Sequence, residues 1–189
     1  QPLQKLVMAM AALLLALAAS ASALSIAPDP QAVPRSCEGM MSMPASATGP
    51  RPIEPLDLLR LRDMGYMHLG PGQRLLALSP DKRQAAFVMH RADPSTNRYC
   101  VALMVLDLEA NGPPRILDQA DDLLMEAVIM RGMEVDYGLP RPLLPSWSAD
   151  GKRVAYLRKV NGLAQIIDVT VANGTSRQIT HSPVGVDQF

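Results

Sequence analysis

The sequence predicts an all-β fold assembled from about two four-stranded antiparallel sheets. Two observations predict it. Apolar runs of about five to eight residues alternate with short polar turns, which is typical of an antiparallel meander. One short sequence pattern also occurs twice, as "LALSPDKRQAAF" at residues 76–87 and as "SWSADGKRVAY" at residues 146–156. A phrase that recurs with its flanking strands indicates a structural repeat.

The N-terminus has the composition of a secretory signal peptide. Lys5 precedes an uncharged apolar run, and the small-residue triplet Ala21-Ser22-Ala23 suits signal peptidase. A membrane anchor is the alternative, but the apolar run is shorter than the roughly 20 residues that span a bilayer. We therefore expect residues 1–23 to direct export to the periplasm and to be removed, which leaves no stable membrane span.

Residues 24–55 form a leader rich in Pro, Ser and Ala. Proline fixes φ and lacks a backbone donor, so we expect an extended segment rather than a packed element. The following "PLDLLRLRDMG", residues 55–65, predicts a short helix. Pro55 suits its first turn, Asp57 complements the helix dipole, and Gly65 is its expected end.

Cys37 and Cys100 are the two cysteines of the chain, and both follow the expected cleavage point. An exported protein meets an oxidising compartment, and two cysteines allow one intramolecular pairing. A reactive thiol is the rival interpretation, but no motif places a base beside either residue. We expect a Cys37–Cys100 disulfide that ties the leader to the folded body, with loop closure contributing about 4 kcal/mol.

The first repeat unit follows the helix. Its expected strands are "LLALS" (75–79), "RQAAFVMH" (83–90), "YCVALMVLDL" (99–108) and the start of a fourth in "PRILD" (114–118), with a loop at Ala92–Asn97 and a turn at Asn111-Gly112. Both faces of "VALMVL" are apolar. We therefore expect this sheet to be covered on both sides.

The second unit repeats the order. Its expected strands are "PSWS" (145–148), "RVAYLRKV" (153–160), "AQIIDVTV" (164–171) and "SRQIT" (176–180), with Asn161-Gly162 as a tight hairpin. Ser79 aligns with Ser148 and Phe87 with Tyr156, an offset of 69 residues. A four-stranded blade needs about 40–50 residues, so the first unit must carry an insertion. We place it within residues 118–144, where the apolar spacing fits neither helix nor strand.

The conformational and hydrogen-bonding preferences of turn residues explain why the same residues recur in both copies. Asp81 and Asp150 stand at the same place in the two turns, where an Asp side chain can accept backbone N–H groups. Gly151 can adopt positive φ without a Cβ clash. Lys82 replaces this glycine in the first copy, which implies a different turn or local strain.

The unit S-x-D-G-K-R-x-A-[FY], followed by a hairpin, an I/V-rich strand, an NG turn and "xxIT", resembles the WD40-like propeller repeat. Such repeats occur in periplasmic Tol-associated propellers and in the propellers of prolyl oligopeptidase-type serine peptidases. The resemblance covers about residues 74–182. It implies that residues 56–189 form a partial β-propeller of about two blades.

A narrower resemblance rests on the order of segments: signal peptide, leader with one Cys, "DLLRLRDMG", and then the first unit with its distinctive "RADPSTNRYC" (91–100). This order is similar to the N-terminal part of lasso peptide isopeptidases, exported members of the prolyl oligopeptidase group. The resemblance implies a propeller that gates substrate access. It also implies a following α/β-hydrolase domain whose Ser, Asp and His hydrolyse the isopeptide bond of a threaded peptide.

We assign no catalytic residue to this chain. A nucleophile elbow needs G-x-S-x-G, and no such pentad occurs in the 189 residues. We therefore expect a chain truncated before any α/β-hydrolase domain, without hydrolytic activity and without a cofactor. The alternative function is a non-catalytic periplasmic propeller of the Tol-associated type that binds envelope proteins.

The remaining candidates have structural interpretations that we prefer. They are His68, His90 and His181 as ligands or bases, the methionines of "MMSM" (40–43) as a copper site, Asp121, Asp122 and Glu126 as an acidic patch, Asn173-Gly174-Thr175 as a glycosylation sequon, and Trp147 in a ligand channel. Lys+Arg and Asp+Glu both number 18, so the formal net charge is zero. That balance gives no sign of a nucleic-acid surface.

Overall fold

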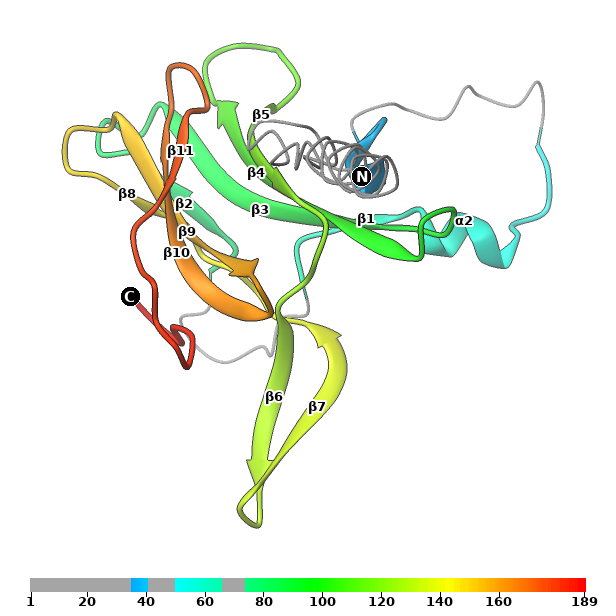
Figure 1. Ribbon diagram of the computed structural model, residues 1–189. Coiled ribbons are helices and arrows are strands. Elements are labelled where there is room, and N and C mark those ends of the chain that lie inside the picture. Colours follow the sequence, from blue (N-terminus) through cyan, green and yellow to red (C-terminus); the bar gives the residue numbers. More distant parts are fainter. Residues whose placement is uncertain (1–34, 41–49, 66–73) are drawn as a thin grey trace, which may run out of the picture. The chain divides into compact units, whose positions relative to one another are not determined.

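The computed structural model describes residues 35–40, 50–65 and 74–189 (Figure 1). The expected signal peptide and most of the leader lie outside these residues. The elements are η1 (Arg35–Cys37), α2 (Pro55–Leu59), β1 (Arg62–Asp63), β2 (Leu76–Leu78), β3 (Gln84–Asp93), β4 (Arg98–Asp107), β5 (Arg115–Ala120), β6 (Met125–Met130), β7 (Met133–Pro140), β8 (Ser146–Trp147), β9 (Arg153–Val160), β10 (Leu163–Thr170) and β11 (Ser176–Gln178).

The strands form two sheets of matching topology. In the first sheet β2, β3, β4 and β5 lie side by side, and β1 also pairs with β3; in the second the order is β8, β9, β10, β11. Every pairing is antiparallel. The registers match too, because Ala77 pairs with Ala86 in the first sheet and Ser146 with Ala155 in the second. The predicted all-β fold of two four-stranded units is confirmed.

The main core lies between these sheets. Alternate residues of β3 and β4, such as Val88, Leu103 and Val105, join residues of β9 and β10, such as Val154 and Ile167, in one buried cluster. Strand side chains alternate between faces, so this cluster uses one face of the first sheet. Burying a side chain of this size contributes about 1.5–3 kcal/mol, which makes this contact the main source of stability.

The opposite face of the first sheet is also covered, as its apolar pattern predicted. Phe87, Ala102 and Met104 form a second cluster with Cys37 and Met40. Cys37 belongs to η1, and Met40 ends the turn that follows it. We call residues 35–40 the strap.

The position of the strap on the first sheet can be compared with the packing of the second sheet. Phe87 pairs with Met104, and the equivalent pair in the second sheet is Tyr156 with Ile167. Tyr156 and Ile167 face the first sheet, whereas Phe87 and Met104 face the strap. The strap therefore covers, on the first sheet, the face that a preceding sheet would cover.

Two expectations near the first sheet are wrong in detail. The helix ends at Leu59, not at Gly65, because Arg62 and Asp63 pair as β1 with the end of β3. Gly65 has φ +99° and lies against Pro142, where an added Cβ would be 3.1 Å from the Pro142 Cα. The loop expected at Ala92–Asn97 is shorter, since β3 continues to Asp93.

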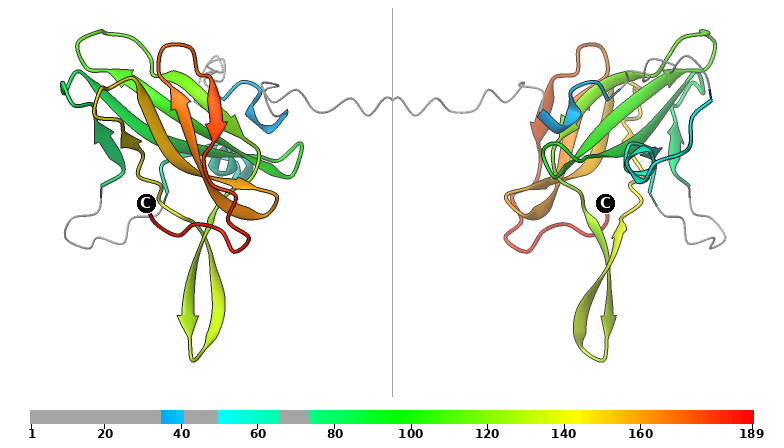
Figure 2. Two further views of the ribbon diagram at one scale, coloured as in Figure 1. Left: turned by 60° about the vertical axis from the view of Figure 1, so that its left-hand side comes forward. Right: turned by 90° about the vertical axis from the view of Figure 1, so that its right-hand side faces the viewer.

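The insertion is a hairpin. β6 and β7 pair only with each other among the described strands, and they form a separate two-stranded sheet. In Figures 1 and 2 they appear as a twisted ribbon that belongs to neither of the two larger sheets. Its turn, Arg131-Gly132, has positive φ at both residues, 51° and 81°. This is the geometry of a tight I′-type hairpin.

Candidate functional site

The repeated turns use their polar groups internally. In the first turn the Ser79 hydroxyl donates to Asp81 Oδ1 (2.6 Å), which also accepts from the Arg83 N–H (3.1 Å). In the second, the Ser148 hydroxyl donates to Asp150 Oδ1 (2.6 Å), which accepts from the Lys152 N–H (3.1 Å). Each Ser oxygen also accepts a backbone N–H, at 3.0 Å in both copies.

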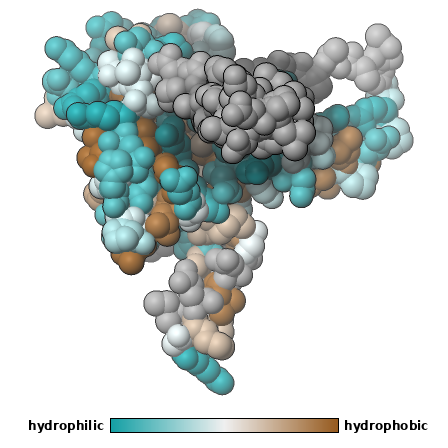
Figure 3. Space-filling model, in the orientation of Figure 1, coloured by the Kyte–Doolittle hydropathy of each residue, from teal (hydrophilic) through white to brown (hydrophobic). Residues whose placement is uncertain are grey.

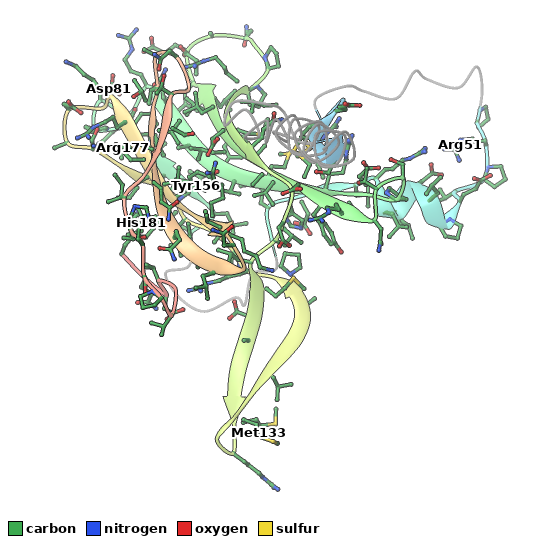
Figure 4. The ribbon with its side chains drawn as sticks, viewed as in Figure 1. Arg51, Asp81, Met133, Tyr156, Arg177 and His181 are labelled. Atoms are coloured by element: carbon green, nitrogen blue, oxygen red, sulfur yellow. A yellow bond between two sulfur atoms is a disulfide. The ribbon has the colours of Figure 1, made fainter. Side chains whose placement is uncertain are left out.

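These contacts affect the acidity of both carboxyl groups. The Ser79 hydroxyl and the Arg83 N–H hold the pKa of Asp81 below its ordinary value. The Ser148 hydroxyl and the Lys152 N–H do the same to the pKa of Asp150. The low pKa values therefore follow from turn hydrogen bonds, and the two residues stabilise turns rather than form a reactive site. Figure 4 places Asp81 in such a turn.

The fourth residue of each turn, counted from the turn's serine, has a left-handed backbone conformation. Gly151 has φ 68°, and Lys82 has φ 60° at the same position of the first copy. The backbone N–H of each donates to the carbonyl of the turn's serine, both at 2.9 Å. The first turn is therefore the same turn with a strained residue, which resolves the two possibilities left open for Lys82.

Cys37 and Cys100 form a disulfide, with Cα atoms 4.7 Å apart. Both residues are buried. The strap is also held by two arginines: Arg91 donates to the carbonyls of Glu38 and Gly39 (both 3.1 Å), and Arg62 Nε donates to the Met40 carbonyl (2.6 Å). Met40 of the "MMSM" run is thus a core residue, and Met41 to Met43 lie outside the described residues.

A polar network bridges the two sheets. Asp118 of β5 accepts from the Tyr156 hydroxyl and from Arg158 Nη1 of β9, both at 2.7 Å. Tyr156 is fully buried, and burial raises the pKa of Tyr156 above its ordinary value, with the nearby Asp118 charge adding to the effect. This network was not predicted from the sequence. The available signal was the hydroxyl that distinguishes Tyr156 from its counterpart Phe87.

The other sequence candidates have partners of their own. Asp121 lies 3.7 Å from Arg98, and Asp122 lies 3.1 Å from Lys159, so the two do not form an unpaired acidic patch. Trp147 donates from Nε1 to the Ala77 carbonyl (2.9 Å) and thereby joins β8 to β2. Glu126 is half-buried at the base of the hairpin.

Two of the histidines and the glycosylation sequon can be placed in the structure. His90 is buried in β3, where burial lowers the pKa of its imidazole. His181 lies 3.2 Å from the side chain of Gln178, and His68 is outside the described residues. In the sequon, Asn173 Oδ1 accepts from the Thr175 N–H (3.1 Å), and Gly174 has φ 72°. Asn173 and Gly174 form the β10–β11 turn.

The hairpin β6–β7 exposes apolar side chains to solvent. Its exposed apolar side chains are Met130 (51%), Met133 (66%), Val135 (38%) and Leu139 (37%). Met130 pairs with Met133, and Val135 lies two residues further along β7, so these three share one face. Figure 3 shows brown and pale residues along this ribbon above a hydrophilic tip.

The base of the hairpin is firmly held, in contrast to its tip. Leu123 and Leu143, just outside its two strands, are buried in the main core, and Met125 packs against that core. The Arg141 N–H donates to the Leu124 carbonyl (2.8 Å) and closes the base. A groove of about 390 Å³ begins there, lined by residues 141–146, Leu157 and residues 187–189.

Within 35–40, 50–65 and 74–189, no three His, Cys, Asp or Glu side chains gather closely enough to hold a metal ion. No described helix is long and apolar enough to cross a membrane.

The two antiparallel sheets and their repeated turns are typical of propeller-type repeats, and comparison with known proteins shows which proteins the chain resembles. No family model matches the chain. The lasso peptide isopeptidase AtxE2 of Asticcacaulis excentricus is 31% identical over 124 residues, which are 65% of this chain and 18% of that protein.

Solved structures agree. The apo structure of AtxE2 isopeptidase superimposes with a TM-score of 0.67 and 27% identity over 72% of this chain and 21% of that one. A serine-to-alanine AtxE2 variant with Astexin3-dC4 bound gives a TM-score of 0.66 and 26% identity over the same shares. The chain therefore spans about a fifth of the length of these relatives. The resemblance to lasso peptide isopeptidases that the sequence predicted is confirmed.

Proposed function

We propose that this chain is the propeller-forming portion of an exported serine peptidase of the prolyl oligopeptidase type that hydrolyses the isopeptide bond of lasso peptides. The observation that carries the proposal is its similarity to AtxE2, 31% in sequence over 124 residues and 0.67 in TM-score. The related structure with Astexin3-dC4 bound supports a lasso peptide as the substrate. In this proposal the sheets restrict and orient the substrate, and hydrolysis occurs in a domain outside these 189 residues.

Within this function, the hairpin β6–β7 is the element that we assign to contact with the peptide. Insertions in repeat proteins tend to lie on the binding face, and this hairpin is an insertion between the two repeat units. Its exposed face of Met130, Met133 and Val135 suits an apolar peptide surface. Two paired strands alone are only marginally stable in water, so a contact that covers this face would also stabilise the hairpin.

The experiment that tests the function is hydrolysis by the full-length protein that contains this segment. A purified lasso peptide and its unthreaded linear counterpart are incubated with it, and the products are analysed by mass spectrometry. We expect the lasso peptide to gain one water at its isopeptide bond. An intact lasso peptide, together with stable capture of envelope proteins, would instead favour the non-catalytic propeller.

A further inference from the structure

Three Asn-Gly pairs lie in turns of this chain, at residues 111–112, 161–162 and 173–174. All three asparagines are exposed, but their backbones are held very differently. We propose that Asn111 is a site of spontaneous deamidation in the folded protein and that the turns protect Asn161 and Asn173. The co-reactant is water, and the proposal does not depend on the function proposed above.

The chemistry sets a geometric requirement. The backbone nitrogen of the glycine attacks the Asn Cγ, the new N–Cγ bond forms, and the Cγ–Nδ2 bond breaks. The leaving nitrogen departs as ammonia with the proton from the backbone amide. Water then opens the resulting succinimide at either carbonyl, which gives aspartate or isoaspartate without any redox change. The glycine N–H must therefore be free, and the Asn backbone must be able to rotate.

The Asn111 pair meets this requirement. No hydrogen bond from another described residue reaches the Gly112 N–H or the Asn111 side chain. An added Cβ at Gly112 would have no atom within 4 Å, so the surroundings are open. The preceding turn is fixed separately, because Asp107 Oδ1 accepts from the backbone N–H groups of residues 109 and 110 (2.9 and 3.1 Å). The constraint ends before Asn111.

Neither of the other two pairs meets both conditions. Gly174 donates its N–H to the Thr170 carbonyl (2.8 Å), and Asn173 Oδ1 is already an acceptor for Thr175. Asn161 has φ 50° in a two-residue hairpin whose flanking residues, 160 and 163, are paired. Rotation of either backbone would require local opening, which costs free energy.

Deamidation at Asn111 would alter charge and backbone together. The formal net charge of zero would become negative by one. The new carboxylate would stand two residues from Glu109, which pairs with Arg83. Isoaspartate would also add a methylene to the main chain just before β5. The product belongs to the class of isoaspartyl peptides, which enzymatic carboxyl methylation detects.

The test is to incubate the purified folded protein in mildly alkaline buffer and to follow all three sites by peptide mapping and isoaspartyl methylation. We expect Asn111 to react first. Asn173 should react at least roughly tenfold more slowly, since each turn hydrogen bond that must break costs about 1 kcal/mol. Gly112→Ala should slow Asn111 several-fold while leaving the melting temperature unchanged, because the site has room for a Cβ.

Denaturant provides the control that separates structure from local sequence. In the unfolded chain the protection at Asn161 and Asn173 should vanish, and the three rates should converge. Equal rates at Asn111 and Asn173 in the folded protein would overturn the proposal. The same ranking in denaturant would also overturn it, because the order would then come from sequence alone.

Discussion

At the scale of single residues, Ser79 and Ser148 show why the same letters recur. Each hydroxyl donates to an Asp two residues later and accepts a backbone N–H from the start of the next strand. A Trp, a Ser and an Asp close together in "SWSADGKRVAY" could suggest catalysis. Their hydrogen bonds are instead satisfied within a turn and between strands, so these residues specify the architecture.

Lys82 is the one residue of the first turn that departs from this chemistry. It is exposed and has φ 60°, where a Cβ is unfavourable. Lys82→Gly should raise the free energy of unfolding by about 0.5–1 kcal/mol, after the extra entropy of glycine in the unfolded chain is subtracted. Urea unfolding measures this. Lys152→Gly, without positive φ, is the matched control and should destabilise; equal effects of the two changes would contradict the strain.

The two turn carboxylates should make stability fall in acid. Hydrogen bonds lower the pKa of Asp81 and of Asp150 in the folded state. Their contribution is therefore present above the unfolded-state pKa and is lost as the pH falls through the folded pKa. The double variant Asp81→Asn/Asp150→Asn should flatten the decline in unfolding free energy between neutral pH and about pH 3. Glu126→Gln serves as the control, and an unchanged slope in the double variant would refute the assignment.

At the scale of elements, the β10–β11 turn is fixed by a close backbone approach. Gly174 has φ +72°, and an added Cβ would lie 2.7 Å from the Leu117 carbonyl oxygen of β5. Gly174→Ala should therefore cost about 2–4 kcal/mol, from left-handed strain plus the clash. Gly162→Ala is the matched comparison. It has φ +83° with nothing within 4 Å, so it should cost only about 1–2 kcal/mol. Thermal unfolding of both variants decides whether the clash matters.

The strap depends on the bond between Cys37 and Cys100. Alkylation of the purified protein without reductant should label no cysteine, and reduction should expose two thiols. Removing both sulfurs as Cys37→Ser/Cys100→Ser should lower the unfolding free energy by about 4 kcal/mol, because the bond closes a sequence separation of 63 residues. Two free thiols before reduction would reject the disulfide.

Several elements could be predicted because local signals bound them. Asn161-Gly162 separates β9 from β10, and continuous apolar runs bounded by polar turns mark β3 and β4. The helix was predicted to continue to Gly65 because Arg62 and Asp63 fit a helical pattern. Their pairing with β3 makes them a strand instead. The hairpin β6–β7 escaped prediction because its turn is Arg131-Gly132, a pair without a strong turn preference.

At the scale of the whole molecule, most features that could not be predicted from the sequence depend on contacts between residues far apart in the chain. The Tyr156–Asp118 bond joins residues 38 positions apart and exists only once the sheets stack. The strap's role as a cover for the first sheet likewise depends on Phe87 and Met104 facing away from the second sheet. Periodicity predicts which faces are apolar, but it does not say which segment covers each face.

The most direct test of the central claim, that this segment orients a lasso peptide, is the kinetics of the full-length protein with a hairpin variant. Met130→Ser/Met133→Ser removes the exposed methionines beside the turn and keeps the turn itself. Leu163→Ser on the β9–β10 hairpin is the matched control, with melting temperatures confirming that both fold. We predict that KM for the lasso peptide rises roughly tenfold in the hairpin variant, about 1.4 kcal/mol of lost binding, with kcat unchanged and the control like wild type. Unchanged KM in the hairpin variant, in an enzyme that hydrolyses the lasso peptide, would contradict this role for the segment.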